Sequence, residues 1–266
     1  MNFDYLPTLG TSIKDLDTPA LLLDLDIVEE NILKMQKSAN NMNVSMRPHA
    51  KTHKSTFWAK KQIDSGAIGI CCAKIGEAEI MARSGIKEIL ITSQIIGPHK
   101  IQRLISISKM TNVIVACDSE ENIRELSMAS TAHEVNLGVM IEVNVGMNRC
   151  GISPSNALDF ARLIDTLPGL IFKGVMGYEG HVVHERDYEI RSIKTSESMK
   201  TLQNSVKIIN EGNISCEIVS AAGTGTYRFS GSMDLVTELQ CGSYIFMDGD
   251  YLEVMDDFRS GLFLLS

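Results

Sequence analysis

Short apolar runs rich in β-branched residues alternate with amphipathic stretches along most of this chain of 266 residues. Nine such runs cover residues 20–25, 44–49, 67–73, 88–93, 112–118, 137–145, 171–178, 216–222 and 237–247. Strands that are apolar throughout and alternate with helices are typical of a parallel sheet covered on both faces. The eight runs from residue 44 onward predict an α/β fold, a (β/α)8 TIM barrel, which needs about 250 residues. An open doubly wound sheet is the alternative.

The stretches between the runs predict helices. Residues 26–39, 118–132 and 187–212 have apolar side chains at helical spacing, and Asp118 with Glu121 resembles a capping box. The last of these stretches has one apolar side formed by Ile190, Ile193, Met199, Leu202, Val206 and Ile209. Only a short helix fits between the runs at 216–222 and 237–247. The run at 20–25 lies outside the eight, so we expect it to pair elsewhere.

Composition and charge narrow the class of protein. With 44% hydrophobic and 22% charged residues, the chain has values ordinary for a soluble globular protein. A net charge of −8 disfavours nucleic acid as a partner, because phosphate binding needs a basic face. We see neither a signal peptide nor an apolar run of the roughly 18 residues that cross a bilayer, so we expect a cytoplasmic protein without a membrane partner. The six cysteines form no C-x-x-C pair and mostly lie in apolar runs, which predicts reduced, buried thiols.

Polar residues follow several of the predicted strands, at the end where barrels carry their chemistry. His49 and Lys51 follow the first barrel strand within "RPHAKTHKS", Arg149 follows the fifth, and Tyr178 follows the sixth. The segments "GTGTY" (223–227) and "CGSY" (241–244) follow the seventh and eighth. Small residues and hydroxyls let backbone N–H groups close on an anion, and barrels often hold phosphate at these two strands. The two loops therefore predict a phosphate site, with plain tight turns as the alternative.

Lys51 indicates which kind of anion this site could bind. An amine at the end of a buried strand, facing an anion site, is a candidate to form a Schiff base. Desolvation and nearby cations lower a lysine pKa and make the amine nucleophilic. A cofactor with both an aldehyde and a phosphate is pyridoxal 5′-phosphate (PLP).

Several of these residues also have plainer interpretations. Lys51 and Lys54 could cap a solvated loop. Arg149 could pair with Glu142, or meet an oxygen or nitrogen of the cofactor ring. Histidines such as His49 are more often structural than ligands, and the isolated pair at 181 and 184 is a weak metal motif.

Eight segments match one enzyme family in order along nearly the whole chain: "TPALLLDLDIVEENI", "RPHAKTHK", "CCAKIGEAEIMARSGI", "EILITSQIIGPHKI", "IEVNVGMNRCG", "GYEGH", "AAGTGTY" and "ELQCGSYIFMDGDY". On these segments the chain resembles the D-threonine aldolase and D-serine dehydratase family, PLP enzymes with an alanine-racemase-type barrel (PLP fold type III). Metal-assisted D-3-hydroxyaspartate aldolases are similar too. The resemblance implies that Lys51 carries the cofactor and is catalytic, with Arg149 at the ring and Tyr178 beside it. The remaining cofactor-binding residues are then His49 and, for the phosphate, Gly223, Thr224, Gly225, Thr226, Ser243 and Tyr244.

The resemblance also divides the chain. It implies an N-terminal segment over residues 1–25 whose strand belongs to a second β-domain, a PLP-binding barrel over 26–250, and the start of a C-terminal β-domain over 251–266. In the family that domain supplies a divalent-metal site (Mn, Mg or Zn) from a His and a nearby Asp or Cys. No residue here matches those ligands, so we expect them beyond Ser266, in a chain that is apparently truncated.

Together with the site residues, the resemblance implies a PLP-dependent lyase acting on D-β-hydroxy-α-amino acids. Retro-aldol cleavage to glycine and an aldehyde, as in D-threonine aldolase, is the favoured reaction. A D-serine dehydratase (ammonia-lyase) and a non-catalytic PLP-binding barrel or inactive fragment are the alternatives. The expected partners are a small D-amino acid and a second copy of the chain in a homodimer.

Overall fold

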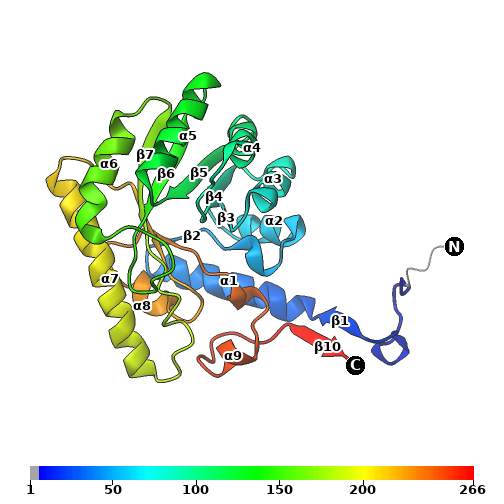
Figure 1. Ribbon diagram of the computed structural model, residues 1–266. Helices are drawn as coiled ribbons and strands as arrows, with labels where there is room; N and C mark the ends of the chain where they lie inside the picture. Colours follow the sequence, from blue (N-terminus) through cyan, green and yellow to red (C-terminus); the bar gives the residue numbers. More distant parts are fainter. Residues whose placement is uncertain (1–5) are drawn as a thin grey trace.

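The structure is a computed structural model that describes residues 6–266 (Figure 1). Its strands are β1 (Ala20–Leu23), β2 (Ser45–Met46), β3 (Ile70–Cys72), β4 (Glu88–Ile91), β5 (Asn112–Cys117), β6 (Leu137–Glu142), β7 (Leu170–Met176), β8 (Ile218–Ala221), β9 (Glu238–Leu239) and β10 (Leu262–Leu265). Its α-helices are α1 (Leu25–Asn41), α2 (Thr56–Asp64), α3 (Ile75–Arg83), α4 (Pro98–Ser108), α5 (Glu120–Ala132), α6 (Ala157–Thr166), α7 (Tyr188–Glu211), α8 (Tyr227–Gly231) and α9 (Gly249–Leu252). Short 3-10 helices include η2 (Ala50–Thr52) and η4 (Ser243–Ile245).

Strands β2 to β9 form one parallel sheet in the order β2-β9-β8-β7-β6-β5-β4-β3. The two end strands meet through a parallel bridge between His49 and Cys71. The backbone N–H of Ile68 also donates to Met46 O, and that of Cys71 to Pro48 O, both at 2.9 Å. These contacts close the sheet on itself, so the predicted barrel is confirmed and the open doubly wound sheet is wrong.

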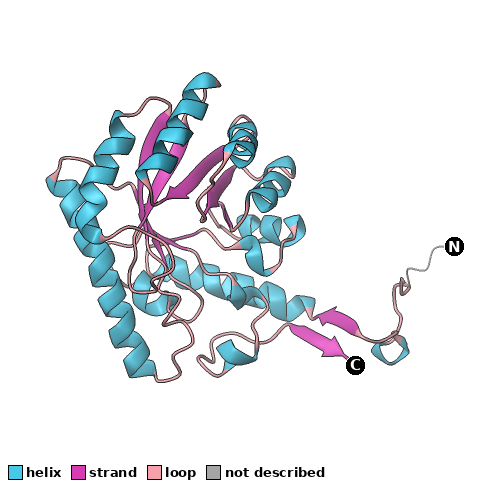
Figure 2. Cartoon of the chain, in the orientation of Figure 1, coloured by secondary structure: helices cyan, strands magenta, loops and turns pink. Residues whose placement is uncertain are grey.

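Helices cover the outside of the barrel (Figure 2). Because side chains alternate across a strand, the strands form an outer and an inner layer, and the inner apolar layer comes from β3 to β7. The outer layer packs against the helices and forms the larger core. The inner layer fills the barrel with Cys71, Leu90, Ile114, Ala116, Met140 and Met176. Burial on both sides explains why these five strands are mostly apolar.

Two details of the helices differ from the sequence prediction. Helix α5 is capped by Ser119, whose side chain accepts from Asn122 N, and not by Asp118. Asp118 instead accepts from Gly151 N at 3.0 Å, which ties two loops together. On α7, Ile190 and Ile193 are exposed, so the apolar side predicted for the whole helix is buried only further along, for example at Met199 and Leu202. The short α8, in contrast, confirms the limited space between β8 and β9.

Strand β1 lies outside the barrel, as its run of sequence predicted, and pairs antiparallel with β10. Figure 1 shows this two-stranded ribbon extending away from the barrel, with the C-terminus at its end. Leu21 and its partner Leu264 are each 68% exposed. The assignment of this ribbon to a second domain remains a prediction, and residues 1–5 of the predicted N-terminal segment lie outside the described residues.

All six cysteines are free, and four of them are buried, as expected for cysteines that lie in apolar runs. Within the described residues, no helix has the length and apolar character that a membrane span requires.

Candidate active site

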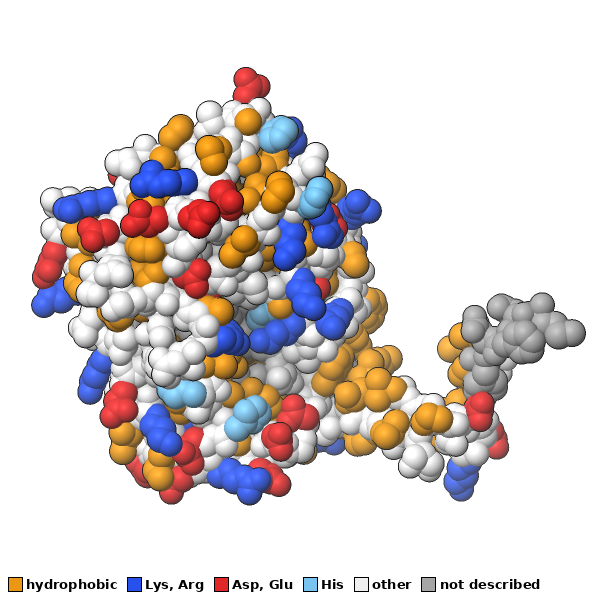
Figure 3. Space-filling view, in the orientation of Figure 1, with side chains coloured by type: hydrophobic (Ala, Val, Ile, Leu, Met, Phe, Trp, Pro, Cys, Tyr) orange, Lys and Arg blue, Asp and Glu red, His pale blue; other side chains and the backbone are white. Residues whose placement is uncertain are grey.

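A pocket opens at the carboxyl ends of the barrel strands, where Figure 3 shows basic and histidine side chains around a hollow. It holds about 460 Å³ of empty space, part of it open to solvent. The lining residues are His49, Lys51, Thr92, Arg149, Met176, Tyr178, Ala222, Gly223, Thr224, Gln240, Gly242, Ser243 and Tyr251. Seven of the ten predicted site residues are therefore brought together. Gly225, Thr226 and Tyr244 do not line the pocket.

Two cations face the pocket beside one aromatic ring. Lys51 lies in η2, just after β2, with its Nζ 5.5 Å from the centre of the Tyr178 ring. The guanidinium carbon of Arg149 lies 5.7 Å from the same ring centre. Within residues 6–266, neither cation forms an ion pair with a carboxylate. Such a pair of cations can attract an anion from solution.

The surroundings of Lys51 favour the neutral, nucleophilic amine. Partial burial among the pocket residues lowers the pKa of Lys51, and the positive charge of Arg149 lowers it further. The expected alternative for Arg149, an ion pair with Glu142, is not formed. Glu142 instead accepts a hydrogen bond of 2.6 Å from Gln94 Nε2, and burial raises its pKa. Arg149 is therefore left facing the pocket.

His49 holds the lysine segment in place. Its Nδ1 accepts from the backbone N–H of Lys51 at 3.3 Å, so the ring proton lies on Nε2, which donates to Thr92 Oγ1 at 3.1 Å. Thr92 Oγ1 in turn donates to Cys72 O at 3.3 Å. Burial, with the charge of Lys51, lowers the pKa of His49 to about 3. His49 therefore stays neutral at physiological pH and fixes the backbone from which Lys51 projects.

The loop after β8 has a strained start. Ala222 lines the pocket with φ 76°, in the left-handed region that side chains other than glycine rarely adopt. Its N–H donates to the fully buried Glu179, which also accepts 2.6 Å from Ser230 Oγ. The Gly223 N–H donates to Thr226 Oγ1 at 3.1 Å. These hydrogen bonds fix the conformation of the loop. The bond from Ala222 N to the buried Glu179 stabilises Ala222 in its strained backbone conformation.

Close backbone packing explains why the loop needs glycine. A Cβ on Gly225 would lie 1.9 Å from Val183 O, so no side chain fits there. Gly225 and Thr226 thus shape the loop from behind and do not face the pocket with their side chains.

The loop after β9 is held against the first one. Thr224 Oγ1 accepts from Tyr244 N at 3.0 Å, which joins the two predicted phosphate loops. The Tyr244 hydroxyl is buried and accepts from Gln62 Nε2 at 2.9 Å, so this tyrosine is a packing residue. Ser243 and Tyr251 both line the pocket.

Three polar lining residues were missed in the sequence: Thr92, Gln240 and Tyr251. Thr92 directly follows β4 and Gln240 directly follows β9, so the rule that strand ends carry the site would have found both. Tyr251 comes from α9, outside the repeating strand–helix pattern. Its ring lies 4.4 Å from that of His184, a contact that sequence spacing gives no reason to expect.

The weak metal motif at residues 181 and 184 does not form a cluster. Within the described chain, the one group of three or more candidate ligands is Asp118, Glu142 and Cys150, with ligand atoms within 4.8 Å of one another. Asp118 and Glu142 in that group already accept hydrogen bonds from Gly151 N and Gln94.

The fold is a parallel (β/α)8 barrel, and its pocket brings Lys51 and Arg149 together with the loops after β8 and β9. Residues 23–250 match the family described as "Alanine racemase, N-terminal domain", and the chain belongs to this family.

Individual relatives are similar over almost the whole chain. A 3-hydroxy-D-aspartate aldolase from Paracoccus denitrificans is 36% identical over 96% of this chain and 67% of the relative. A D-threonine aldolase from Arthrobacter sp. is 36% identical over 91% of this chain and 64% of the relative. The crystal structure of D-threonine aldolase from Filomicrobium marinum has a TM-score of 0.92 and 36% identity, and 95% of this chain matches 70% of that one. The chain thus spans about two thirds of the length of the curated relatives it matches.

Proposed function

We propose that this chain is the barrel of a PLP-dependent lyase that cleaves D-β-hydroxy-α-amino acids. The observation that carries the proposal is that Lys51 and Arg149 line the same pocket as the two loops joined by Thr224. Within the described residues, neither cation forms an ion pair with a carboxylate. The amine and the proposed anion site lie in one pocket, so a single ligand that carries an aldehyde and a phosphate could contact both.

The residues present fit PLP. In the proposed arrangement, Lys51 would take the aldehyde, and the phosphate would lie against the loops of Gly223, Thr224, Gly225 and Thr226 and of Ser243 and Tyr244. A Cβ on Gly223 would lie 2.8 Å from Val183 Cγ1 and 3.1 Å from Tyr178 Cε2, so the loop is already packed tightly from behind. Its pocket side is left for a ligand. His49, Tyr178 and Arg149 would surround the ring.

When bound, PLP supplies an aldehyde that condenses with amines and an electron-poor ring that withdraws electrons from the amino-acid Cα. The chain's own residues prepare that chemistry. The lowered pKa of Lys51 raises the fraction of neutral amine near pH 7. Burial raises the pKa of Tyr178 to about 12, so its hydroxyl remains a proton donor. His49, with its pKa lowered to about 3, adds no positive charge beside them.

The relatives support retro-aldol cleavage as the reaction, because those at 36% identity are aldolases for D-threonine or 3-hydroxy-D-aspartate. In that reaction a base takes the β-hydroxyl proton and the Cα–Cβ bond breaks. The products are an aldehyde and, after protonation of Cα, glycine. A divalent metal that polarises the β-oxygen would assist, as the family resemblance implies. We assign no ligands for it in this chain.

A dehydratase is the second candidate reaction. A D-threo-3-hydroxyaspartate dehydratase from Delftia sp. is 26% identical over 88% of this chain, clearly less than the aldolases. The same PLP-binding residues serve both reactions, and a non-catalytic PLP-binding barrel would also use them. Assembly as a homodimer in the cytoplasm remains a prediction.

Turnover assays distinguish these functions. The PLP-loaded chain, with Mn²⁺, is given D-threonine, D-3-hydroxyaspartate or D-serine, while glycine and 2-oxo-acid release are measured. We expect glycine from the first two substrates and none from L-threonine. A 2-oxo acid as the main product would favour the dehydratase, and PLP binding without any turnover would favour the non-catalytic barrel.

A further inference from the structure

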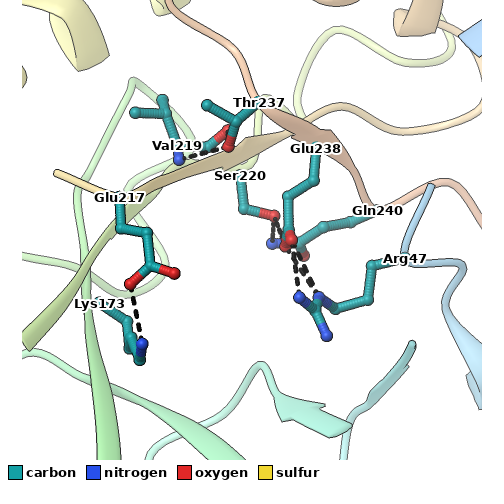
Figure 4. A network of polar contacts seen from close by, with 8 residues as sticks. All are labelled: Arg47, Lys173, Glu217, Val219, Ser220, Thr237, Glu238 and Gln240. Atoms are coloured by element: carbon teal, nitrogen blue, oxygen red, sulfur yellow. Dashed lines mark hydrogen bonds and ion pairs between the residues drawn. The ribbon is translucent and has the colours of Figure 1, made fainter. Parts of the chain in front are cut away.

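A chain of buried polar groups crosses the inside of the barrel and ends at the pocket (Figure 4). It begins with Arg47, whose Nε lies 3.1 and 3.0 Å from the two carboxylate oxygens of Glu238. Ser220 Oγ lies 2.7 Å from Glu238 Oε1, and Gln240 Nε2 lies 2.7 Å from Ser220 Oγ. Arg47, Glu238 and Ser220 are 4%, 2% and 0% exposed, so water does not compete for these bonds. Only Gln240 lines the pocket.

The direction of each hydrogen bond in this chain is fixed by chemistry. Glu238 forms an ion pair with Arg47, so it is a carboxylate and can only accept. Ser220 must therefore give its single hydroxyl proton to Glu238. The Ser220 oxygen is then an acceptor for its other neighbour, and Gln240 must turn its NH₂ group toward it.

This direction leaves the carbonyl oxygen of Gln240 for the pocket. Within residues 6–266, no donor bonds to Gln240 Oε1. A phosphate would be repelled by this oxygen, since both are acceptors, so the phosphate belongs with the backbone N–H groups of the loops. The group that suits Gln240 is a ring N–H.

We propose that Gln240 binds the ring nitrogen of PLP through its carbonyl oxygen and keeps that nitrogen protonated, and that Ser220 and Glu238 act as positioning residues that hold the amide in this orientation. The inference rests on the proposed function. It also assigns Arg149, which has only donors, to an oxygen of the ring or of the substrate. A protonated ring nitrogen withdraws more electron density from Cα, which suits cleavage of a bond at that carbon.

The test uses PLP labelled with ¹⁵N in the ring, bound to the whole chain, and reads the protonation of the nitrogen from its NMR chemical shift. The wild type should show the shift of a protonated pyridine. Gln240→Met, which removes the acceptor at similar volume, should give the unprotonated shift and weaken PLP affinity about tenfold or more. Ser220→Ala frees the amide to turn, so the shift should move part of the way.

Thr237→Val is the matched control. Thr237 directly precedes Glu238 and accepts from Val219 N at 2.9 Å (Figure 4), and it is not a pocket-lining residue. It should leave the shift unchanged.

The failures of the two proposals are distinguishable. If the wild type forms no borohydride-reducible adduct with PLP, the proposed function is wrong. If the adduct forms but its ring nitrogen is unprotonated, or if Gln240→Met and Thr237→Val give the same shift as the wild type, Gln240 does not act in this way.

Discussion

The two ends of the barrel differ in whether their cationic side chains form ion pairs. At the amino-terminal ends of the strands, a cavity is lined by Arg47 and Lys173, and each forms an ion pair, with Glu238 at 2.9 Å and with Glu217 at 2.8 Å (Figure 4). At the carboxyl ends, Lys51 and Arg149 face the pocket without a carboxylate partner in the described chain. An unpaired cation in a partly dry site costs stability, and an arriving anion offsets that cost. Buried charge is paired at the amino-terminal end of the barrel, and it is unpaired in the pocket where we propose that a ligand binds.

The largest expected effect is at the mouth. Replacing Lys51 by Met removes the only amine among the pocket-lining residues. We expect the protein to fold but to retain no PLP after desalting, measured by the visible absorbance of the cofactor. Lys54→Met is the matched control, because Lys54 is exposed three residues further on and does not line the pocket. Equal loss of cofactor in both variants would show that the amine at position 51 has no special role.

The next effect is at the other end and concerns stability. Glu238→Gln leaves the guanidinium of Arg47 buried without its counter-charge, which costs about 3–5 kcal/mol in comparable cases. We expect a fall of this size in the free energy of unfolding, measured with urea. A change of less than about 1 kcal/mol would mean that the ion pair does not hold the barrel together.

Arg149→Met tests the second pocket cation, and we expect a smaller loss of PLP binding than for Lys51→Met. Loss of one charge-assisted contact should weaken PLP affinity about tenfold, while the free energy of unfolding of the PLP-free chain should not fall, because the removed cation has no ion-pair partner in the described chain. The sign of the pH effect follows from the charge: Arg149 lowers the pKa of Lys51, so its removal raises that pKa. The rate of PLP addition should then reach its plateau at higher pH than in the wild type. A profile that moves to lower pH, or does not move, would contradict this coupling.

The smallest effect should come from Glu217→Gln. The Lys173–Glu217 pair lies at the same end as Arg47–Glu238, but the side chain of Glu217 is 65% exposed. Pairs of this kind contribute about 0–1 kcal/mol. We expect an unfolding free energy within that range of the wild type. A loss as large as that of Glu238→Gln would show that burial is not what separates the two pairs.

Periodicity in the sequence was enough to predict nine of the ten described strands and the barrel, because strands buried on two sides have an apolar pattern that helices between them do not share. Strand β10 was not among the predicted runs. The positions of the strand ends predicted most of the pocket residues, because in a barrel the carboxyl ends of the strands meet at one face. Contacts between distant segments were not predictable. Asp118 accepts from Gly151 instead of capping α5, and Tyr251 reaches the pocket from α9. Spacing along the chain does not encode either contact.

The orientation of Gln240 shows a further limit. Its residue type and place at a strand end are visible in the sequence, but the side of the amide that faces the pocket depends on Ser220 and Glu238, which lie on neighbouring strands. Likewise, near the start of α7 the buried face carries Arg191 and Thr195, which leaves Ile190 and Ile193 exposed. Such properties follow from the packing of the whole fold.

The most direct test of the account is where PLP attaches. The chain is incubated with PLP, reduced with borohydride and digested, and the modified peptide is identified by mass spectrometry. Because Lys51 is the lining lysine with a lowered pKa, we predict a single reduced adduct on Lys51. An adduct on Lys54 or Lys74, or one spread over many surface lysines, would contradict the assignment of the unpaired cations at the barrel mouth to this cofactor.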